Sequence, residues 1–196
     1  MGKDAWWGDI QRRRLRHRLR EIWYNWDMNN QAFIDGQNLA LGTTTSKSPW
    51  KVDLYRFRTY LGKKYNVAKA YYFIGCINDN LQGLYDMIQD AGFILVFRAH
   101  YPDVLSSKKG NVDTDIVFTM MKNFHENADV DKFYLVSGDG DYYKTVKYLK
   151  EQGKLGKVLF PARGKASSLY RQLGNGGDYD YLDNPGLRNK IELKNR

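Results

Sequence analysis

The sequence predicts an α/β fold in which helices cover both faces of a central, mostly parallel sheet. Short, continuous apolar runs alternate along the chain with helix-like stretches, a pattern typical of buried parallel strands joined by crossover helices. The length of 196 residues corresponds to one domain that can bury a sizeable core. Apolar residues make up 42% of the chain and charged residues 27%, which are ordinary values for a folded protein.

We expect strands at the apolar or aromatic runs and helices between them. The expected strands lie at residues 32–34, 70–74, 93–97, 133–136 and 157–160, with a last short strand near 179–182. The expected helices lie near residues 53–64, 79–91, 113–127, 142–152 and 166–173. Right-handed crossovers should connect the parallel strands.

Positive charge is concentrated at the two ends of the chain. The formal net charge is +9. Residues 1–28 carry seven Lys/Arg against four Asp/Glu, and residues 186–196 carry four against one. We therefore divide the chain into a basic arm (1–28), a central domain (29–185) and a basic tail (186–196). This distribution suits a polyanionic partner, usually nucleic acid, although a merely soluble basic protein would show it too.

The arm predicts a basic, amphipathic helix that precedes the domain. Its apolar stripe consists of Leu15, Leu19, Ile22, Trp23 and Trp26. Its candidate nucleic-acid contacts are Arg12, Arg13, Arg16 and Arg20. We favour a helix that docks on the domain through its stripe, which is compatible with arginines that grip RNA phosphates. A membrane-surface helix, or a contact with a second copy or a protein partner, is the alternative.

Several classes of protein are excluded. The chain has no run of 18 apolar residues, so we expect no transmembrane helix and no membrane partner. It begins without the apolar core of a signal peptide. Its single cysteine, Cys76, excludes an internal disulfide and a cysteine zinc cluster. A cytoplasmic location fits these features best.

Aspartates follow the carboxyl ends of the predicted strands. Asp35 follows the first strand, Asp139 and Asp141 follow the fourth in the stretch LVSGDGDY, and Asp113 opens the helix after the third. Ligands of open parallel sheets bind beyond these strand ends, so we expect the four carboxylates to converge. Two carboxylates about 4 Å apart repel by roughly 4 kcal/mol at an effective dielectric constant near 20, which requires a shared proton or a cation. Oxygen ligands without a nearby His or Cys favour Mg²⁺ or Mn²⁺ over zinc.

Simpler interpretations apply to each acid alone. An Asp-Gly pair is common in ordinary turns, and Asp35 by itself could cap a helix. An EF-hand is excluded, because Tyr143 and Lys144 stand where its loop needs an oxygen ligand and a glycine. Asp115 cannot share a helix face with Asp113. The joint placement of the acids after two strands and at one helix start therefore carries the metal-site prediction.

Cationic and polar residues are expected at the same edge. Lys109 follows the third strand, and Arg163 and Lys165 follow the fifth. Ser167 opens a predicted helix whose free N–H groups can receive an anion. We add Ser137 and Asn38 as substrate contacts, although Asn38 could equally bond a metal-bound water or stabilise its own turn. Acids that hold a metal beside cations indicate a phosphodiester substrate.

Five stretches, taken together and in order, resemble the NYN family of PIN-like nucleases over about residues 30–185. They are AFIDGQNL, YYFIG, AGFILVFR, KGNVD and LVSGDGDY. The resemblance implies a three-layer αβα PIN-like fold and a metal-dependent endoribonuclease that acts in RNA processing or turnover. It also implies that Asp35, Asp113 and Asp139 hold the metal, that Asp141 is the second acid of the SGDxD element, and that Asn38 is the family's asparagine.

Two other functions stay open on the sequence alone. The first is a non-catalytic RNA-binding or regulatory module that uses the same edge, since many family members have no demonstrated substrate. The second is a metal-dependent phosphatase with Asp35 as its nucleophile. Gln37 argues against the phosphatase, because it occupies the position of the usual second aspartate.

Overall fold

A computed structural model describes residues 29–75, 77–98, 112–174 and 176–194 of the chain. The predicted N-terminal arm with its four candidate arginines lies outside these residues. So do Cys76, the loop that contains Lys109, and the last two residues.

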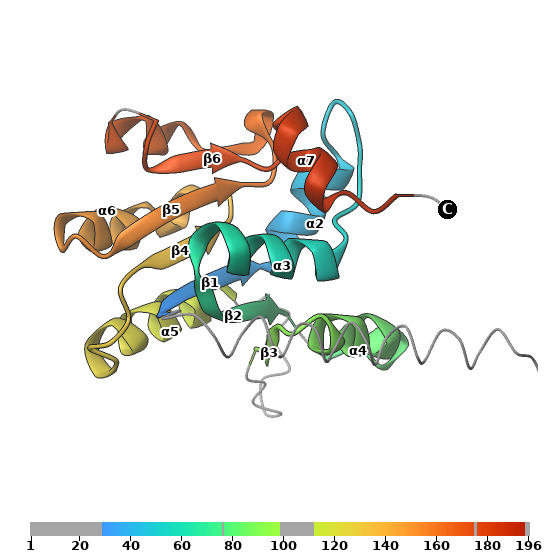
Figure 1. The fold of residues 1–196 in the computed structure, drawn as a ribbon, viewed down its shortest axis with the longest axis horizontal. Helices are drawn as coiled ribbons and strands as arrows, with labels where there is room; N and C mark the ends of the chain where they lie inside the picture. The colour runs from blue at the N-terminus through green and yellow to red at the C-terminus, as the bar shows by residue number, and fades with distance from the viewer. Residues whose placement is uncertain (1–28, 76, 99–111, 175, 195–196) are drawn as a thin grey trace, which may run out of the picture.

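The centre of the molecule is a six-stranded sheet in the order β3-β2-β1-β4-β5-β6 (Figure 1). Its strands are β1 (Asn30–Asp35), β2 (Val67–Ile74), β3 (Ile94–Phe97), β4 (Phe133–Val136), β5 (Leu155–Phe160) and β6 (Tyr179–Tyr181). Every neighbouring pair is parallel, so the expected mostly parallel sheet is parallel throughout. The strand order reverses between β1 and β4, which is where α/β sheets of this type bind ligands.

Helices cover both faces of this sheet, which confirms the three-layer prediction. They are α2 (Gly36–Thr44), α3 (Leu54–Tyr65), α4 (Gln82–Asp90), α5 (Val112–Glu126), α6 (Tyr143–Glu151) and α7 (Pro185–Ile191). Four short 3₁₀ helices join them: η1 (Asp79–Leu81), η2 (Gly140–Tyr142), η3 (Arg163–Lys165) and η4 (Ser168–Leu173). In the described part of the chain, no helix is both long and apolar enough to cross a membrane.

Alternation along β1 divides the core into two halves. Ala32 and Ile34 point to the face covered by α2, α3, α4 and α7, and Phe33 points to the face covered by α5, α6 and η4. Successive side chains of a strand point to opposite faces, so a central strand buried on both sides is apolar without interruption. This explains why β1 reads as a continuous apolar run that ends at a charged residue.

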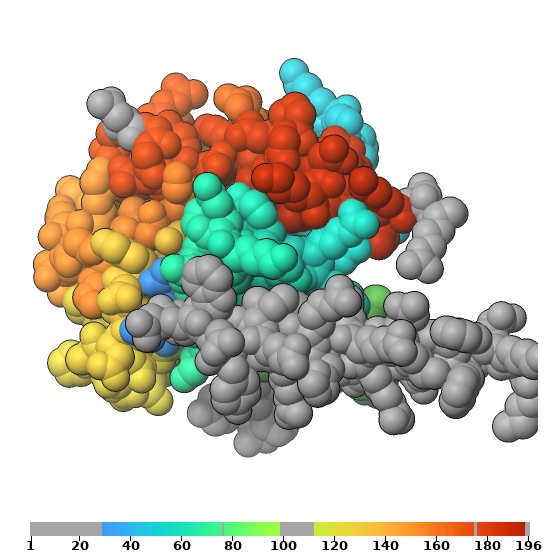
Figure 2. Space-filling view, viewed as in Figure 1, coloured from blue at the N-terminus to red at the C-terminus, as the bar shows by residue number. Residues whose placement is uncertain are grey.

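Two parts of the structure differ in detail from the sequence predictions. The predicted basic tail at 186–196 contains most of helix α7, which packs on α3 (Figure 2). Leu187 and Ile191 of α7 are buried in the core. Two apolar side chains one helical turn apart explain this packing. The helix expected at 166–173 is a 3₁₀ helix, η4, held to the neighbouring loop by a hydrogen bond from Ser167 N to the carbonyl of Gly138.

Candidate metal centre

The adjacent carboxyl ends of β1 and β4 place the first acidic side chain. Ile34 of β1 lies in register with Val136 of β4, so Asp35 comes next to Ser137. Asp35 is also the N-cap of α2, and its Oδ1 accepts a hydrogen bond from Asn38 N at 2.9 Å. One aspartate thus ends a strand, starts a helix and faces the loop after β4.

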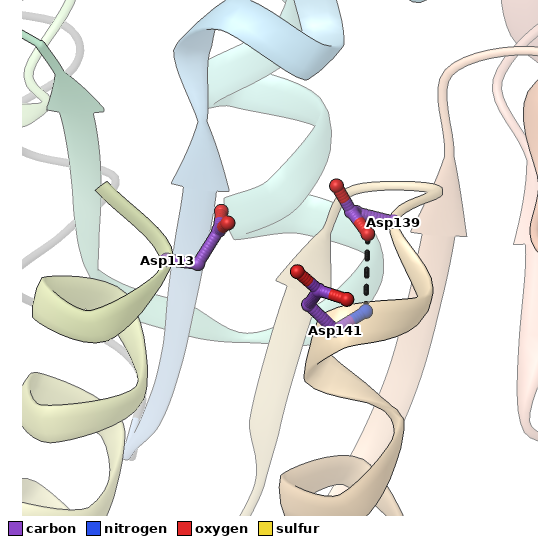
Figure 3. A group of neighbouring side chains, drawn as sticks. All are labelled: Asp113, Asp139 and Asp141. Atoms are coloured by element: carbon purple, nitrogen blue, oxygen red, sulfur yellow. Dashed lines mark hydrogen bonds between the residues drawn. The ribbon is translucent and has the colours of Figure 1, made fainter. Parts of the chain in front are cut away.

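Three further carboxylates converge in front of this edge. Asp113 lies in the first turn of α5, and Asp139 and Asp141 lie in the loop after β4. Each offers one oxygen, and these oxygens lie within 4.8 Å of one another (Figure 3). Asp139 Oδ1 also accepts a hydrogen bond from Asp141 N at 3.0 Å, which fixes the tight turn between the two acids. The structure therefore gathers three of the four predicted acids into one cluster, and Asp115 is not part of it.

Asp35 lies behind the cluster and is only 6% exposed. Its Oδ2 accepts hydrogen bonds from the hydroxyls of Tyr142 at 3.1 Å and Ser137 at 3.4 Å. Burial raises the pKa of Asp35, and the charge of Asp113 adds to this, whereas its hydrogen bonds oppose it. Positive charge that enters the site would oppose this rise in the pKa of Asp35.

Tyr142 joins the buried Asp35 to the cluster, although it was not predicted as a site residue from the sequence. Its buried hydroxyl contacts both Asp35 Oδ2 and Asp113 Oδ1. Burial and the two neighbouring carboxylates raise the pKa of Tyr142, so it stays a neutral donor. The available signal was its position directly after Asp141, but tyrosines are common in the core of this chain.

Asn38 and Ser137 hold the loop that carries Asp139. Asn38 Oδ1 accepts a hydrogen bond from Gly138 N at 2.9 Å, and Ser137 Oγ accepts one from Asp139 N at 3.1 Å. Ser137 is completely buried. Ser137, predicted as a substrate contact, is therefore not exposed to the pocket in this structure, and its hydroxyl instead bonds to Asp35 and to the backbone of Asp139. Asn38 remains at the pocket wall.

The segment after β5 packs closely against the same loop. A Cβ atom at Gly138 would lie 2.4 Å from the carbonyl oxygen of Lys165, so only glycine fits there. Ser167 N donates to the carbonyl of Gly138 at 2.9 Å, and Ser167 Oγ accepts from Leu169 N. These bonds use the backbone N–H groups of Ser167 and Leu169, and the short 3₁₀ helix that follows offers no α-helical N-terminus to receive an anion.

The acids open into a pocket of about 550 Å³. Asp35, Asp113 and Asp139 line it, together with side chains of α2 and with Lys165. Among the described residues, Lys165 is the one cation that lines this pocket. Arg163 is not among them: its guanidinium lies 4.5 Å from the ring centre of Tyr181 and donates to Asn184 Oδ1 at 2.9 Å.

The donor set suits a hard divalent cation. Mg²⁺ and Mn²⁺ prefer oxygen ligands, and three carboxylate oxygens within 4.8 Å of one another could hold such an ion. The oxygens come from carboxylates alone, and the cluster contains no His or Cys. Asp113, Asp139 and Asp141 therefore fit the metal that the sequence predicts, with Asp35 in support behind them.

The fold and the site define a PIN-like α/β protein with an acidic centre at the sheet's switch point. Residues 31–173 match the NYN domain, and the chain belongs to this family of PIN-like nucleases. The crystal structure of a protein of unknown function from Vibrio parahaemolyticus shares the fold, with a TM-score of 0.68 and 18% sequence identity, over 86% of this chain and 99% of that one. A comparison with curated proteins gave no match.

Proposed function

We propose that this protein is an endoribonuclease that hydrolyses RNA phosphodiester bonds with Mg²⁺ or Mn²⁺ held by its aspartates. The observation that carries the proposal is the convergence of three carboxylate oxygens within 4.8 Å at the pocket that Lys165 also lines. Crowded acids beside a cation suit a bound metal and an anionic phosphate together. Membership of the NYN family supports the nuclease class and RNA as the substrate.

Each residue has a distinct role in this proposal. A bound divalent ion supplies charge stabilisation at the phosphate and lowers the pKa of a water molecule. Asp113, Asp139 and Asp141 are the proposed ligands, and Asp35 adds negative charge behind them. Lys165 binds a phosphate oxygen and stabilises negative charge that develops during cleavage.

Other residues orient these groups. Tyr142 aligns Asp113 with Asp35, and Asn38 and Ser137 hold the loop that carries Asp139. Groups that fix the ligands of a metal commonly change its affinity 10- to 100-fold when they are removed. The basic residues of the arm (Arg12, Arg13, Arg16 and Arg20) and Lys109 are proposed to add salt-sensitive affinity for RNA.

The first experiment is cleavage of end-labelled RNA of mixed structure by the purified protein. We expect cleavage with Mn²⁺ or Mg²⁺, none with chelator, and products with 5′-phosphate ends. Asp139→Asn should abolish cleavage. Asp115→Asn is the matched control. Asp115 lies in the first turn of α5, two residues after Asp113, and does not belong to the acidic cluster.

One result of this experiment would contradict the nuclease proposal. Wild type and Asp139→Asn would bind several classes of RNA alike, and neither would cut any of them in the presence of metal. The protein would then be a non-catalytic RNA-binding module that uses the same edge.

A further inference from the structure

The candidate site is larger than a metal ion requires. Its volume is about 550 Å³. An ion with six waters fills roughly 180 Å³ at about 30 Å³ per water. Pockets of about 300–1,000 Å³ are typical of sites for small organic ligands. The remaining space is sufficient for the organic part of a nucleotide beside the acids.

One helix face forms the wall of this space. Gln37, Leu41 and Thr45 all line the pocket, and they follow one another at intervals of four residues along α2 and its C-cap. Residues four apart lie on one helix face, so the three side chains form a ridge about 12 Å long. Leu41 is 52% exposed although it borders a pocket of carboxylates.

The position of the ridge is fixed by packing of the neighbouring residues of α2. A Cβ atom at Gly42 would lie 2.5 Å from Cβ of Pro161, so α2 lies directly against the end of β5. Leu39 and Thr43 are buried, and Thr43 Oγ1 donates to the carbonyl of Leu39 at 3.0 Å. A wall held this firmly is suited to discriminate between ligands.

The chemistry of the ridge matches that of a nucleobase. Leu41 offers an aliphatic surface for the flat face of a base, and the exposed amide of Gln37 offers both a donor and an acceptor for a base edge. Thr45 Oγ1 donates to the carbonyl of Leu41 at 2.7 Å, so its oxygen remains as an acceptor. The ridge thus combines apolar contact with hydrogen-bonding groups on either side.

We propose that the ridge of Gln37, Leu41 and Thr45 is a nucleobase subsite that sets the nucleotide preference next to the scissile phosphate. The subsite rests on the proposed function, because it assumes that the phosphate of an RNA strand lies at the acids. It assigns Leu41 to stacking on the base and Gln37 to reading its edge.

Cleavage of a random-sequence single-stranded RNA pool, followed by sequencing of the ends, tests the preference. Wild type should favour particular nucleotides beside the cut. Leu41→Ala should lower kcat/KM about fivefold, the low end of the range for a base that stacks on an aromatic ring, because leucine offers apolar contact without a π-face, and Gln37→Ala should flatten the preference. Leu193→Ala is the matched control, since Leu193 is 49% exposed and lies outside this pocket. Unchanged rates and profiles for both ridge variants would overturn the subsite.

A second measurement separates the subsite from the proposed activity. The full-length Asp139→Asn protein is irradiated without metal in complex with RNA that contains 4-thiouridine, and the crosslinked peptides are identified by mass spectrometry. Crosslinks in residues 36–45 support the subsite even if wild type never cuts RNA. Cleavage by wild type with crosslinks only elsewhere would sustain the nuclease and reject the subsite. Absence of any crosslink in residues 36–45 counts against the subsite in every case.

Discussion

The hydroxyl of Tyr142 lies 3.1 Å from Oδ2 of Asp35, in the interior of the protein. The same hydroxyl contacts Asp113, which is half-buried and lines the pocket. A tyrosine hydroxyl has a single proton, so it cannot donate fully to two carboxylates at once. Tyr142 therefore couples the two acids, and a change at one of them alters the environment of the other.

Tyr142→Phe tests this coupling with little change in shape. We expect Mn²⁺ affinity to fall roughly 10- to 100-fold, because Asp113 loses the group that orients it. Isothermal titration of Mn²⁺ measures the effect. Tyr143→Phe is the neighbouring control, since its hydroxyl bonds to Gln172 away from the acids. Equal Mn²⁺ affinities for wild type and Tyr142→Phe would show that Tyr142 serves packing alone.

Asp35→Asn should stabilise the protein in the absence of metal. Burial raises the pKa of Asp35 in the folded protein above its ordinary value of 3.8, which applies in the unfolded chain. At a pH between the unfolded-state pKa and the folded-state pKa, the folded state therefore binds more protons than the unfolded state. The free energy of unfolding of wild type therefore falls as pH rises from about 4 through the raised pKa, and the neutral asparagine escapes this loss.

Urea denaturation in chelator at pH 4 and pH 7 measures the difference. At pH 7 the variant should be more stable by about 0.5–2 kcal/mol, the common size of a single stabilising substitution, and at pH 4 the gap should close. Added Mn²⁺ should stabilise wild type more than the variant. A variant that is less stable at pH 7 would mean that the hydrogen bonds to Asp35 outweigh the cost of burying its charge.

Gly138→Ala should disturb the site through the backbone. The added Cβ would meet the carbonyl oxygen of Lys165 at 2.4 Å, and backbone cannot move aside as a flexible side chain would. We expect a loss of about 1–3 kcal/mol in stability and at least tenfold in cleavage. Gly164→Ala is the matched control, because a Cβ at Gly164 meets no atom within 4 Å. Thermal denaturation and the cleavage assay give both readouts, and wild-type behaviour of Gly138→Ala would refute the packing argument.

Lys165→Met and Arg163→Met should differ although the two residues are neighbours. Lys165 lines the pocket, so its loss should lower kcat/KM about tenfold or more. The slope of the logarithm of the RNA binding constant against the logarithm of the salt concentration should fall in magnitude by about one. Arg163 lies over Tyr181, so its loss should leave cleavage nearly unchanged. Salt titrations of RNA binding and steady-state kinetics decide the matter. A larger defect in Arg163→Met would reverse the assignment.

The sequence predicted the sheet and most of the acidic centre for one physical reason. Buried parallel strands are apolar without interruption, so each strand end is visible, and the acids that follow it must meet at one edge. Helix α2 was missed, because its two glycines and its threonines are poor helix formers and tertiary contacts stabilise it instead. The roles of Tyr142 and Ser137 could not be predicted, because they depend on hydrogen bonds to Asp35. Both residues are more than 100 positions from Asp35 in the chain.

The close contact between Gly138 and Lys165 also bears on how the protein is made. During synthesis the chain emerges from its N-terminus, and Asp35 and Asp113 leave the ribosome well before the loop of Asp139 can be held in place. The Asp139 loop becomes fixed only after residues 165–167 have been synthesised and their backbone packs and hydrogen-bonds against Gly138. A growing chain thus carries an acidic centre whose Asp139 loop is not yet held in place until the residues after β5 have emerged and packed against it.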